Sequence, residues 1–187
     1  GCWAYPDMLE VGVTNSQRPG FPTLTYTESR SHFGAWCIMS APLMIAMDLR
    51  DTEKLQSVWD ILTNTVAIDI NQRFYQQSGV LHASSTQQQH FSNCSWFNND
   101  GCDHPEWMVY RKQLDEATTA FLLMNNKNAT MTVTADLTLG GIGIDCATDA
   151  GCSVRDVWAH KQLEVLKTNA ISADLASRDS AFYVIYH

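Results

Sequence analysis

Three side chains near the start of the chain have the types and spacing to bind a polar ligand. Trp3, Asp7 and Met8 place an aromatic ring, a carboxylate and a soft apolar side chain within the run WAYPDM. This mixture is more typical of a pocket than of a core. At the C-terminal end of a parallel strand, a carboxylate points to the region where α/β barrels build their active sites. Asp7 therefore either contacts a polar ligand or caps the turn that follows Pro6.

Other residues that could carry chemistry have simpler structural interpretations. Asp48 follows the next expected strand, and we expect it to hydrogen-bond to the loop after that strand. His32 is expected to be a packing histidine on a helix, and Cys37 a buried free thiol. The sequence contains no recognisable Ser-His-Asp arrangement, Gly-rich phosphate loop or paired acidic motif.

The six cysteines indicate local disulfides. Cys94 and Cys102 form one close pair, and Cys146 and Cys152 form another, both among Gly, Asn and Asp residues. We predict a Cys94–Cys102 and a Cys146–Cys152 disulfide, whereas Cys2 would find a partner outside this chain. A metal site is not predicted, because a third candidate near the first pair gives no tetrahedral register.

Two sequons accompany the paired cysteines. Asn93-Cys94-Ser95 and Asn128-Ala129-Thr130 each match the acceptor pattern for N-glycosylation. We therefore predict N-glycans on Asn93 and Asn128. Together with the disulfides, they predict a secretory route to an extracellular, lysosome-like or vacuole-like compartment.

Composition limits the class of protein further. The chain has 187 residues, of which 45% are hydrophobic, as expected for a globular protein with a core. A net charge of -8 with only 12 Lys and Arg residues argues against nucleic acid as a partner. The longest apolar runs, such as residues 41–47, fall far short of the roughly 20 residues that cross a bilayer. The start at Gly1, without Met or a signal-peptide pattern, suggests an internal part of a longer polypeptide.

The first 72 residues alternate strand and helix signals. A strand-like run around MLEVG precedes a helix over residues 28–40, and Pro42 ends that helix. A short strand over residues 43–47 follows. Asp51 or Thr52 then caps a second helix with one apolar face. This order predicts βα units beside a parallel sheet.

From about Val66 the pattern changes, and no further good helix pattern is found. Residues 130–139 alternate apolar and polar side chains, as a half-buried strand does. Further strands are expected at residues 107–110, 120–124, 154–158 and 182–186, which predicts an antiparallel β domain. Residues 76–102, rich in Gln, Ser and Asn, are expected to form a long surface loop closed by the first cysteine pair.

Several segments in this order and spacing resemble the C-terminal part of glycoside hydrolase family 27, the α-galactosidase and α-N-acetylgalactosaminidase family. The resemblance spans nearly the whole chain, is most specific over the first 72 residues and is poor between 73 and about 105. The segments are WAYPDMLEVG (3–12), ESRSHFGAW (28–36), APL (41–43), MDLR (47–50), ILTN (61–64), IDINQ (68–72), VRDVWAHK (154–161) and SAFYVIY (180–186).

The resemblance implies an α/β plus all-β fold. Residues 1–72 would be the last two βα units, with strands 7 and 8, of a TIM (β/α)8 barrel. Residues 73–187 would be an antiparallel β-sandwich domain, with a long disulfide-closed loop at about 76–105.

The resemblance also implies the chemistry. In the PDML motif, Asp7 would line the galactose pocket as a polar wall and Met8 as an apolar contact, with Trp3 beside them. Family members are retaining enzymes with two catalytic aspartates, and both belong to barrel segments before this motif. No catalytic residue is therefore expected in this chain, nor a cofactor or a metal, and the chain alone is predicted to be inactive.

Two functions remain open at this point. The first is part of a secreted retaining exo-glycosidase that removes terminal α-galactosyl residues, with the N-terminal barrel portion as partner and a homo-oligomer possible. The second is a non-catalytic extracellular glycoprotein module with a structural or carbohydrate-binding role. Ala4 and Tyr5 stand where the family usually has Asn-Asp, which motivates the second interpretation.

Overall fold

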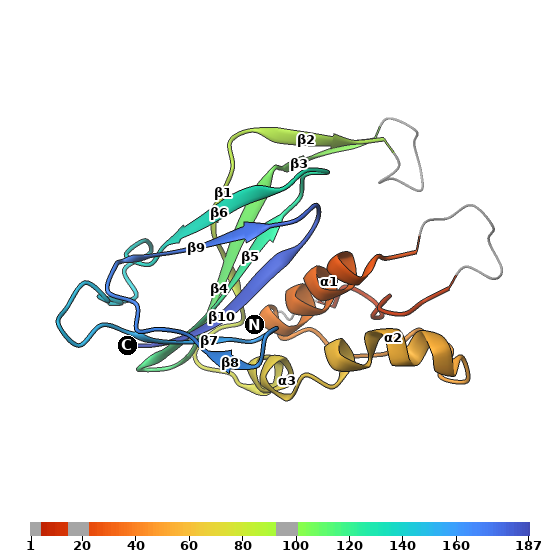
Figure 1. Cartoon of the computed structure of the whole chain (residues 1–187), viewed down its shortest axis with the longest axis horizontal. Coiled ribbons are helices and arrows are strands. Elements are labelled where there is room, and N and C mark those ends of the chain that lie inside the picture. The colour runs from red at the N-terminus through yellow and green to blue at the C-terminus, as the bar shows by residue number, and fades with distance from the viewer. Residues whose placement is uncertain (1–4, 15–22, 93–100) are drawn as a thin grey trace.

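The computed structural model describes residues 5–14, 23–92 and 101–187, and Figure 1 shows a helical layer beside a layered set of strands. The helices within these ranges are α1 (Tyr26–Ile38), α2 (Thr52–Leu62) and α3 (Thr65–Gln72). The first two lie where the sequence predicts them. The third corrects the expectation that no helix follows Val66.

Side-chain caps explain where the helices begin. Thr25 and Glu28 form a capping box at α1, in which the Thr25 amide donates to Glu28 Oε2 at 2.8 Å. Asp51 accepts a hydrogen bond from the Lys54 amide at the start of α2. Asn64 does the same for the Ala67 amide at the start of α3. Because α3 has only eight residues, its apolar spacing gives little signal, and its cap marks it better.

The strands form antiparallel ladders, as predicted. A six-stranded sheet has the order β1-β4-β5-β10-β7-β8, while β6 pairs with β9, and β2 with β3. The strand bounds are β1 (Val80–Ser84), β2 (Gln88–Phe91), β3 (Cys102–Pro105), β4 (Trp107–Asp115), β5 (Thr118–Asn125), β6 (Met131–Asp136), β7 (Ser153–Asp156), β8 (Lys161–Gln162), β9 (Ala170–Leu175) and β10 (Ser180–Tyr186).

The expected surface loop at residues 76–102 is wrong in part, because β1 and β2 lie within it. β1 is an edge strand paired with β4, and its burial shows no clean alternation. β2 is Gln-rich, and its pairing with β3 forms an arm that projects from the main sheet in Figure 1. Pairing with a partner strand, rather than β propensity, places these residues in strands.

The six-stranded sheet is covered on both faces. One face packs against the helices, and this core includes Phe33 and Ile70 with Leu122 and Phe182. The opposite face packs against β6 and β9 in a second core. The strand predicted at residues 130–139 is β6, and it alternates buried and exposed side chains as expected. The result is a β sandwich with two cores. The six-stranded sheet packs against β6 and β9 on one face and against the helices on the other.

A buried lysine side chain connects the sheet to the helical layer. Lys112 of β4 is only 1% exposed, and its ammonium group donates to Ser40 Oγ at 2.5 Å, to Asn71 O at 3.3 Å and to Ile70 O. The last two acceptors are main-chain carbonyls near the end of α3, where a cation is favourable. Burial lowers the pKa of Lys112 to about 8. This side chain therefore joins the sheet to the helical layer.

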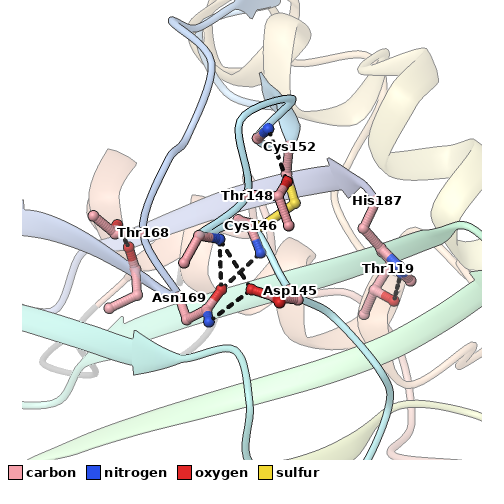
Figure 2. The surroundings of a disulfide bond; sticks show 11 residues. Thr119, Asp145, Cys146, Thr148, Cys152, Thr168, Asn169 and His187 are labelled. Carbon is pink, nitrogen blue, oxygen red and sulfur yellow. Dashed lines mark hydrogen bonds between the residues drawn. A yellow bond between two sulfur atoms is a disulfide. The ribbon is translucent and has the colours of Figure 1, made fainter.

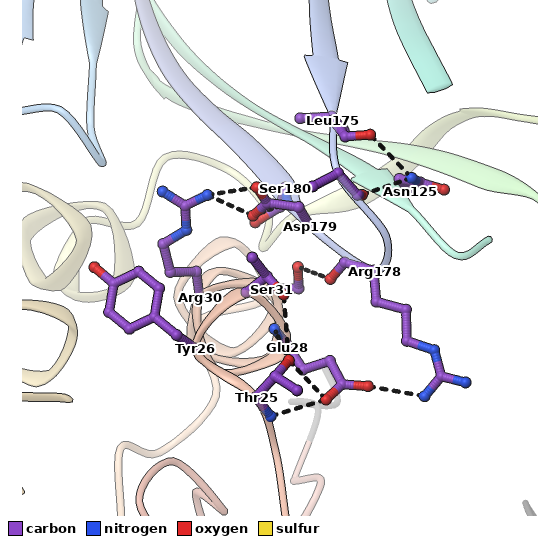
Figure 3. A network of polar contacts seen from close by, with 12 residues as sticks. Thr25, Tyr26, Glu28, Arg30, Ser31, Asn125, Leu175, Arg178, Asp179 and Ser180 are labelled. Atoms are coloured by element: carbon purple, nitrogen blue, oxygen red, sulfur yellow. Dashed lines mark hydrogen bonds and ion pairs between the residues drawn. The ribbon is translucent and has the colours of Figure 1, made fainter. Parts of the chain in front are cut away.

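A second polar contact joins α1 to the turn between β9 and β10 (Figure 3). Arg30 donates twice to the Asp179 carboxylate, at 2.5 and 2.6 Å. Ser31 Oγ donates to the main-chain carbonyl of Arg178 at 2.9 Å. Arg178 Nη1 in turn donates to Glu28 Oε1 at 2.8 Å. The first two turns of α1 are therefore held on the β domain by charge-assisted hydrogen bonds.

The predicted Cys146–Cys152 disulfide is present (Figure 2). The chain beside it is held by Asn169, whose Oδ1 accepts from the amides of Cys146, at 2.6 Å, and Ala147, at 3.1 Å. Both cysteines are buried in the core between the two sheets. Cys102 is also disulfide-bonded. Cys94 lies outside the described residues, so its pairing with Cys102 stays a prediction.

Removal of this disulfide should lower the free energy of unfolding. A Cys146→Ala, Cys152→Ala double variant loses a short loop closure, which corresponds to about 2 kcal/mol in the chain-entropy model. Urea unfolding of the complete protein under oxidising conditions measures the effect. Addition of a reductant should destabilise the wild type more than the double variant, because both proteins keep the disulfide at Cys102 and only the wild type has the Cys146–Cys152 bond. Equal stability of the two proteins would contradict a structural role for the bond.

Candidate functional site

Two segments expected to be neighbouring strands do lie side by side. Leu9 and Ile45 form an isolated parallel bridge. The Leu9 amide donates to Met44 O at 2.7 Å, and the Ala46 amide donates to Leu9 O at 3.2 Å. This pattern is that of adjacent parallel strands. Each segment precedes a helix in the predicted order, but within the described residues the two share only this isolated bridge and form no longer strand.

Asp7 and Met8 lie just before this bridge, and both side chains are exposed. Asp7 has φ = 76°, in the left-handed region that non-glycine residues seldom adopt, although Asp tolerates it better than most. An unusual backbone conformation of this kind is often found at functional sites. Trp3 lies outside the described residues. A ligand contact by any of the three remains a proposal.

His32 fixes the segment that follows Asp7. Its Nε2 accepts a hydrogen bond from the Glu10 amide at 3.1 Å, so the neutral ring carries its proton on Nδ1. The ring also stacks on Trp36, with centroids 3.9 Å apart. Burial lowers the pKa of His32 to about 4. The predicted packing role agrees with this environment, since a neutral ring is needed as acceptor.

Acid should destabilise the protein through His32. The folded-state pKa of about 4 lies below the ordinary value of 6.5, so the unfolded state binds more protons between these two pH values. The contribution of neutral His32 is complete above about pH 6.5 and is lost as the pH falls toward 4. In a His32→Gln variant, the fall in unfolding free energy over this window should be smaller by roughly 1 to 3 kcal/mol. Identical pH dependence in both proteins would refute the assignment.

Two other candidate residues have the structural roles expected of them. The Asp48 carboxylate accepts hydrogen bonds from the Arg50 amide, at 3.0 Å, and from its guanidinium, at 2.9 and 2.8 Å. These bonds lower the pKa of Asp48 to about 2. Cys37 is a buried free thiol whose pKa is raised by burial. Neither residue is poised for proton transfer or nucleophilic attack.

A hollow of about 510 Å³ opens beside these segments. Its lining comes from Tyr5, from residues 40–43 after α1, and from residues 71–74 at the end of α3 and just beyond it. Asp7 and Met8 do not line it. No motif in the sequence indicates this hollow, although its lining includes the aromatic side chains of Tyr5 and Phe74.

The described ranges show neither a metal cluster nor a membrane-spanning helix. No group of three or more His, Cys, Asp or Glu side chains there could hold a metal ion. No helix there is long and apolar enough to cross a membrane. Of the two predicted glycosylation sites, Asn128 is exposed, whereas Asn93 lies outside the described residues.

Comparison with known proteins extends these observations. The family model described as alpha galactosidase A matches residues 1–73, and that of the alpha galactosidase C-terminal beta sandwich domain matches residues 105–185. Alpha-galactosidase 3 of Arabidopsis thaliana is 28% identical over 185 residues, which are 99% of this chain and 36% of that protein. This chain thus spans about a third of the length of such relatives.

Solved structures share the fold. Alpha-galactosidase I of Mortierella vinacea has a TM-score of 0.71 at 19% identity, over 98% of this chain and 39% of that one. A family 27 β-L-arabinopyranosidase of Geobacillus stearothermophilus has a TM-score of 0.74 at 19% identity, over 99% of this chain and 37% of that one. The two family models together cover most of this chain and define its class as alpha galactosidase-like, with a C-terminal β sandwich. The chain belongs to the α-galactosidase family, glycoside hydrolase family 27, and corresponds to the C-terminal portion of that family.

Proposed function

We propose that the complete protein is a secreted retaining exo-glycosidase that removes terminal α-galactosyl residues from oligosaccharides or glycoconjugates. The observation that carries this proposal is the alignment of α-galactosidases over 99% of the chain, including the segment with Asp7 and Met8. A route through an oxidising compartment, either extracellular or lysosome- or vacuole-like, agrees with the buried Cys146–Cys152 disulfide.

In this proposal the chain supplies one wall of the sugar pocket. Asp7 accepts hydrogen bonds from sugar hydroxyls, while Met8 and Trp3 contact the apolar face of the ring. Asp7 binds and does not attack. A retaining mechanism needs two carboxyl groups roughly 5 to 5.5 Å apart, one as nucleophile and one as acid/base. We assign both to barrel segments that precede the PDML motif in the family.

The partner of this chain is then the N-terminal portion of the barrel. Residues 1–72 would be barrel strands 7 and 8 with their helices, and residues 73–187 the β domain. The exposed apolar side chains near the parallel bridge support this assignment, since a barrel would cover them. They are Tyr5, Met8, Met44, Ile45 and Leu49.

The test is an assay of the complete protein on chromogenic α-galactoside, α-N-acetylgalactosaminide and β-L-arabinopyranoside. We expect turnover of the α-galactoside with retention of anomeric configuration. The arabinopyranoside is included because the neighbour from Geobacillus stearothermophilus is a β-L-arabinopyranosidase. Activity on another of the three substrates alone would change the substrate class, and no turnover of any would favour the non-catalytic module.

A further inference from the structure

A small hollow lies between α1, the β2–β3 arm and the end of β5. Its volume is about 190 Å³, below the roughly 300 Å³ at which pockets for small molecules begin. Space of this size suits a single sugar residue. Its lining residues are Glu28, Ser31, Phe91, Met124, Asn125, Asn126 and Arg178.

Arg178 is the polar centre of this hollow. Its Nη1 donates to Glu28 Oε1 at 2.8 Å, and its Nε donates to Asn128 Oδ1 at 2.8 Å. Its guanidinium carbon lies 5.2 Å from the centroid of the Phe91 ring. Figure 3 shows the guanidinium reaching toward Glu28 on α1. Among the described residues, Nη2 donates no hydrogen bond and so remains able to bind a ligand oxygen.

Asn128 is hydrogen-bonded to Arg178 of this lining and begins the sequon Asn128-Ala129-Thr130. All three residues are exposed. The bond from Arg178 occupies the carbonyl oxygen of the Asn128 amide and fixes its orientation. Its nitrogen, Nδ2, has no hydrogen-bond partner among the described residues. Nδ2 is the atom that an N-linked glycan modifies, so the bond from Arg178 in the folded protein leaves the attachment atom unoccupied.

We propose that Asn128 carries an N-linked glycan whose first N-acetylglucosamine lies against Arg178 in this hollow. In the transfer, Nδ2 bonds to C1 of a lipid-linked oligosaccharide, the bond from C1 to the lipid pyrophosphate breaks, and Nδ2 loses one proton. After folding, Arg178 holds the amide oxygen through Nε and donates from Nη2 to the sugar. The glycan thereby stabilises the contact of the β5–β6 turn with α1 and the arm.

The first test asks whether the site is modified. The complete protein is secreted from a eukaryotic host as an Asn93→Gln variant, so that Asn128 heads the one sequon left in residues 1–187. The peptide with residues 128–130 is mapped by mass spectrometry. We expect a glycopeptide in this protein and in its Thr130→Ser form, and an unmodified peptide in its Thr130→Ala form. An unmodified peptide in the Thr130→Ser form would overturn the proposal.

The second test asks where the first sugar lies. We expect the Thr130→Ala protein to melt about 2 to 4 °C below its Thr130→Ser counterpart. Trimming by an endoglycosidase that leaves one N-acetylglucosamine should not lower the melting temperature of the Thr130→Ser protein. In an Arg178→Ala background the two variants should melt together. A trimmed protein that melts like Thr130→Ala, or a difference that persists without Arg178, would refute the contact.

Discussion

Replacement of Asp7 by Asn in the complete protein should weaken binding of the terminal galactose by about 1 to 3 kcal/mol, the scale of a charge-assisted hydrogen bond. This corresponds to an affinity loss of between about 5-fold and about 150-fold. Asn is the right replacement because it keeps the size of the side chain and tolerates the left-handed conformation at φ = 76°. The measurement is the inhibition constant of galactose together with kcat/KM.

Asp48 provides the matched control. Like Asp7, it is an exposed carboxylate beside one of the two bridged segments, but Arg50 already holds it through several hydrogen bonds. Asp48→Asn should therefore leave galactose affinity within about 2-fold of the wild type, since surface ion pairs contribute little. A covalent inhibitor of retaining enzymes should label an aspartate outside this chain. A label on Asp7, or equal losses in both variants, would refute the binding role.

An element of this fold could be predicted when its own residues carry the pattern, and not when a partner strand determines its structure. The start of α2 was predictable, because a cap residue precedes an apolar face, and β6 was predictable from its alternation. β2 and β9 were not, because partner strands rather than their own composition place them in sheets. Trp59 of α2 is large and apolar but is 53% exposed. The spacing of apolar residues predicts the helix but does not show how much of the helix surface is covered by neighbouring elements.

For the candidate site, the sequence proposes residues but does not show the contacts that support them. The resemblance pointed to Asp7 and Met8, and the single-residue interpretations of His32 and Asp48 agree with their contacts. No pattern could show that His32 accepts from the Glu10 amide, or that Lys112 bonds to the end of α3. Such contacts join residues far apart in the chain, and periodicity carries no information about them.

The shared core of the helices and the sheet bears on how this chain behaves by itself. Phe33 and Ile70 pack in one cluster with Leu122 and Phe182, and Lys112 bonds across the same boundary. The helical layer therefore has a partner in the β domain. On its other side, the bridged segments present exposed apolar side chains, including Met8 and Ile45, and strand edges joined by only one bridge. Edges and apolar surface of this kind promote aggregation unless they are covered.

Expressed alone, residues 1–187 should hydrolyse no α-galactoside and should bind a hydrophobic dye that the complete protein does not bind. Two βα units cannot close an eight-stranded barrel, and double displacement needs a carboxylate pair across one glycosidic bond, which we assign to the preceding barrel segments. Addition of the N-terminal portion should reduce dye binding and restore turnover. When the same portion is added to an Asp7→Asn chain, dye binding should again fall, but the substrate should bind more weakly than it does with the wild-type chain. Turnover by residues 1–187 alone would overturn the assignment of both catalytic carboxylates to the other portion, because the chemistry would then lie within this chain.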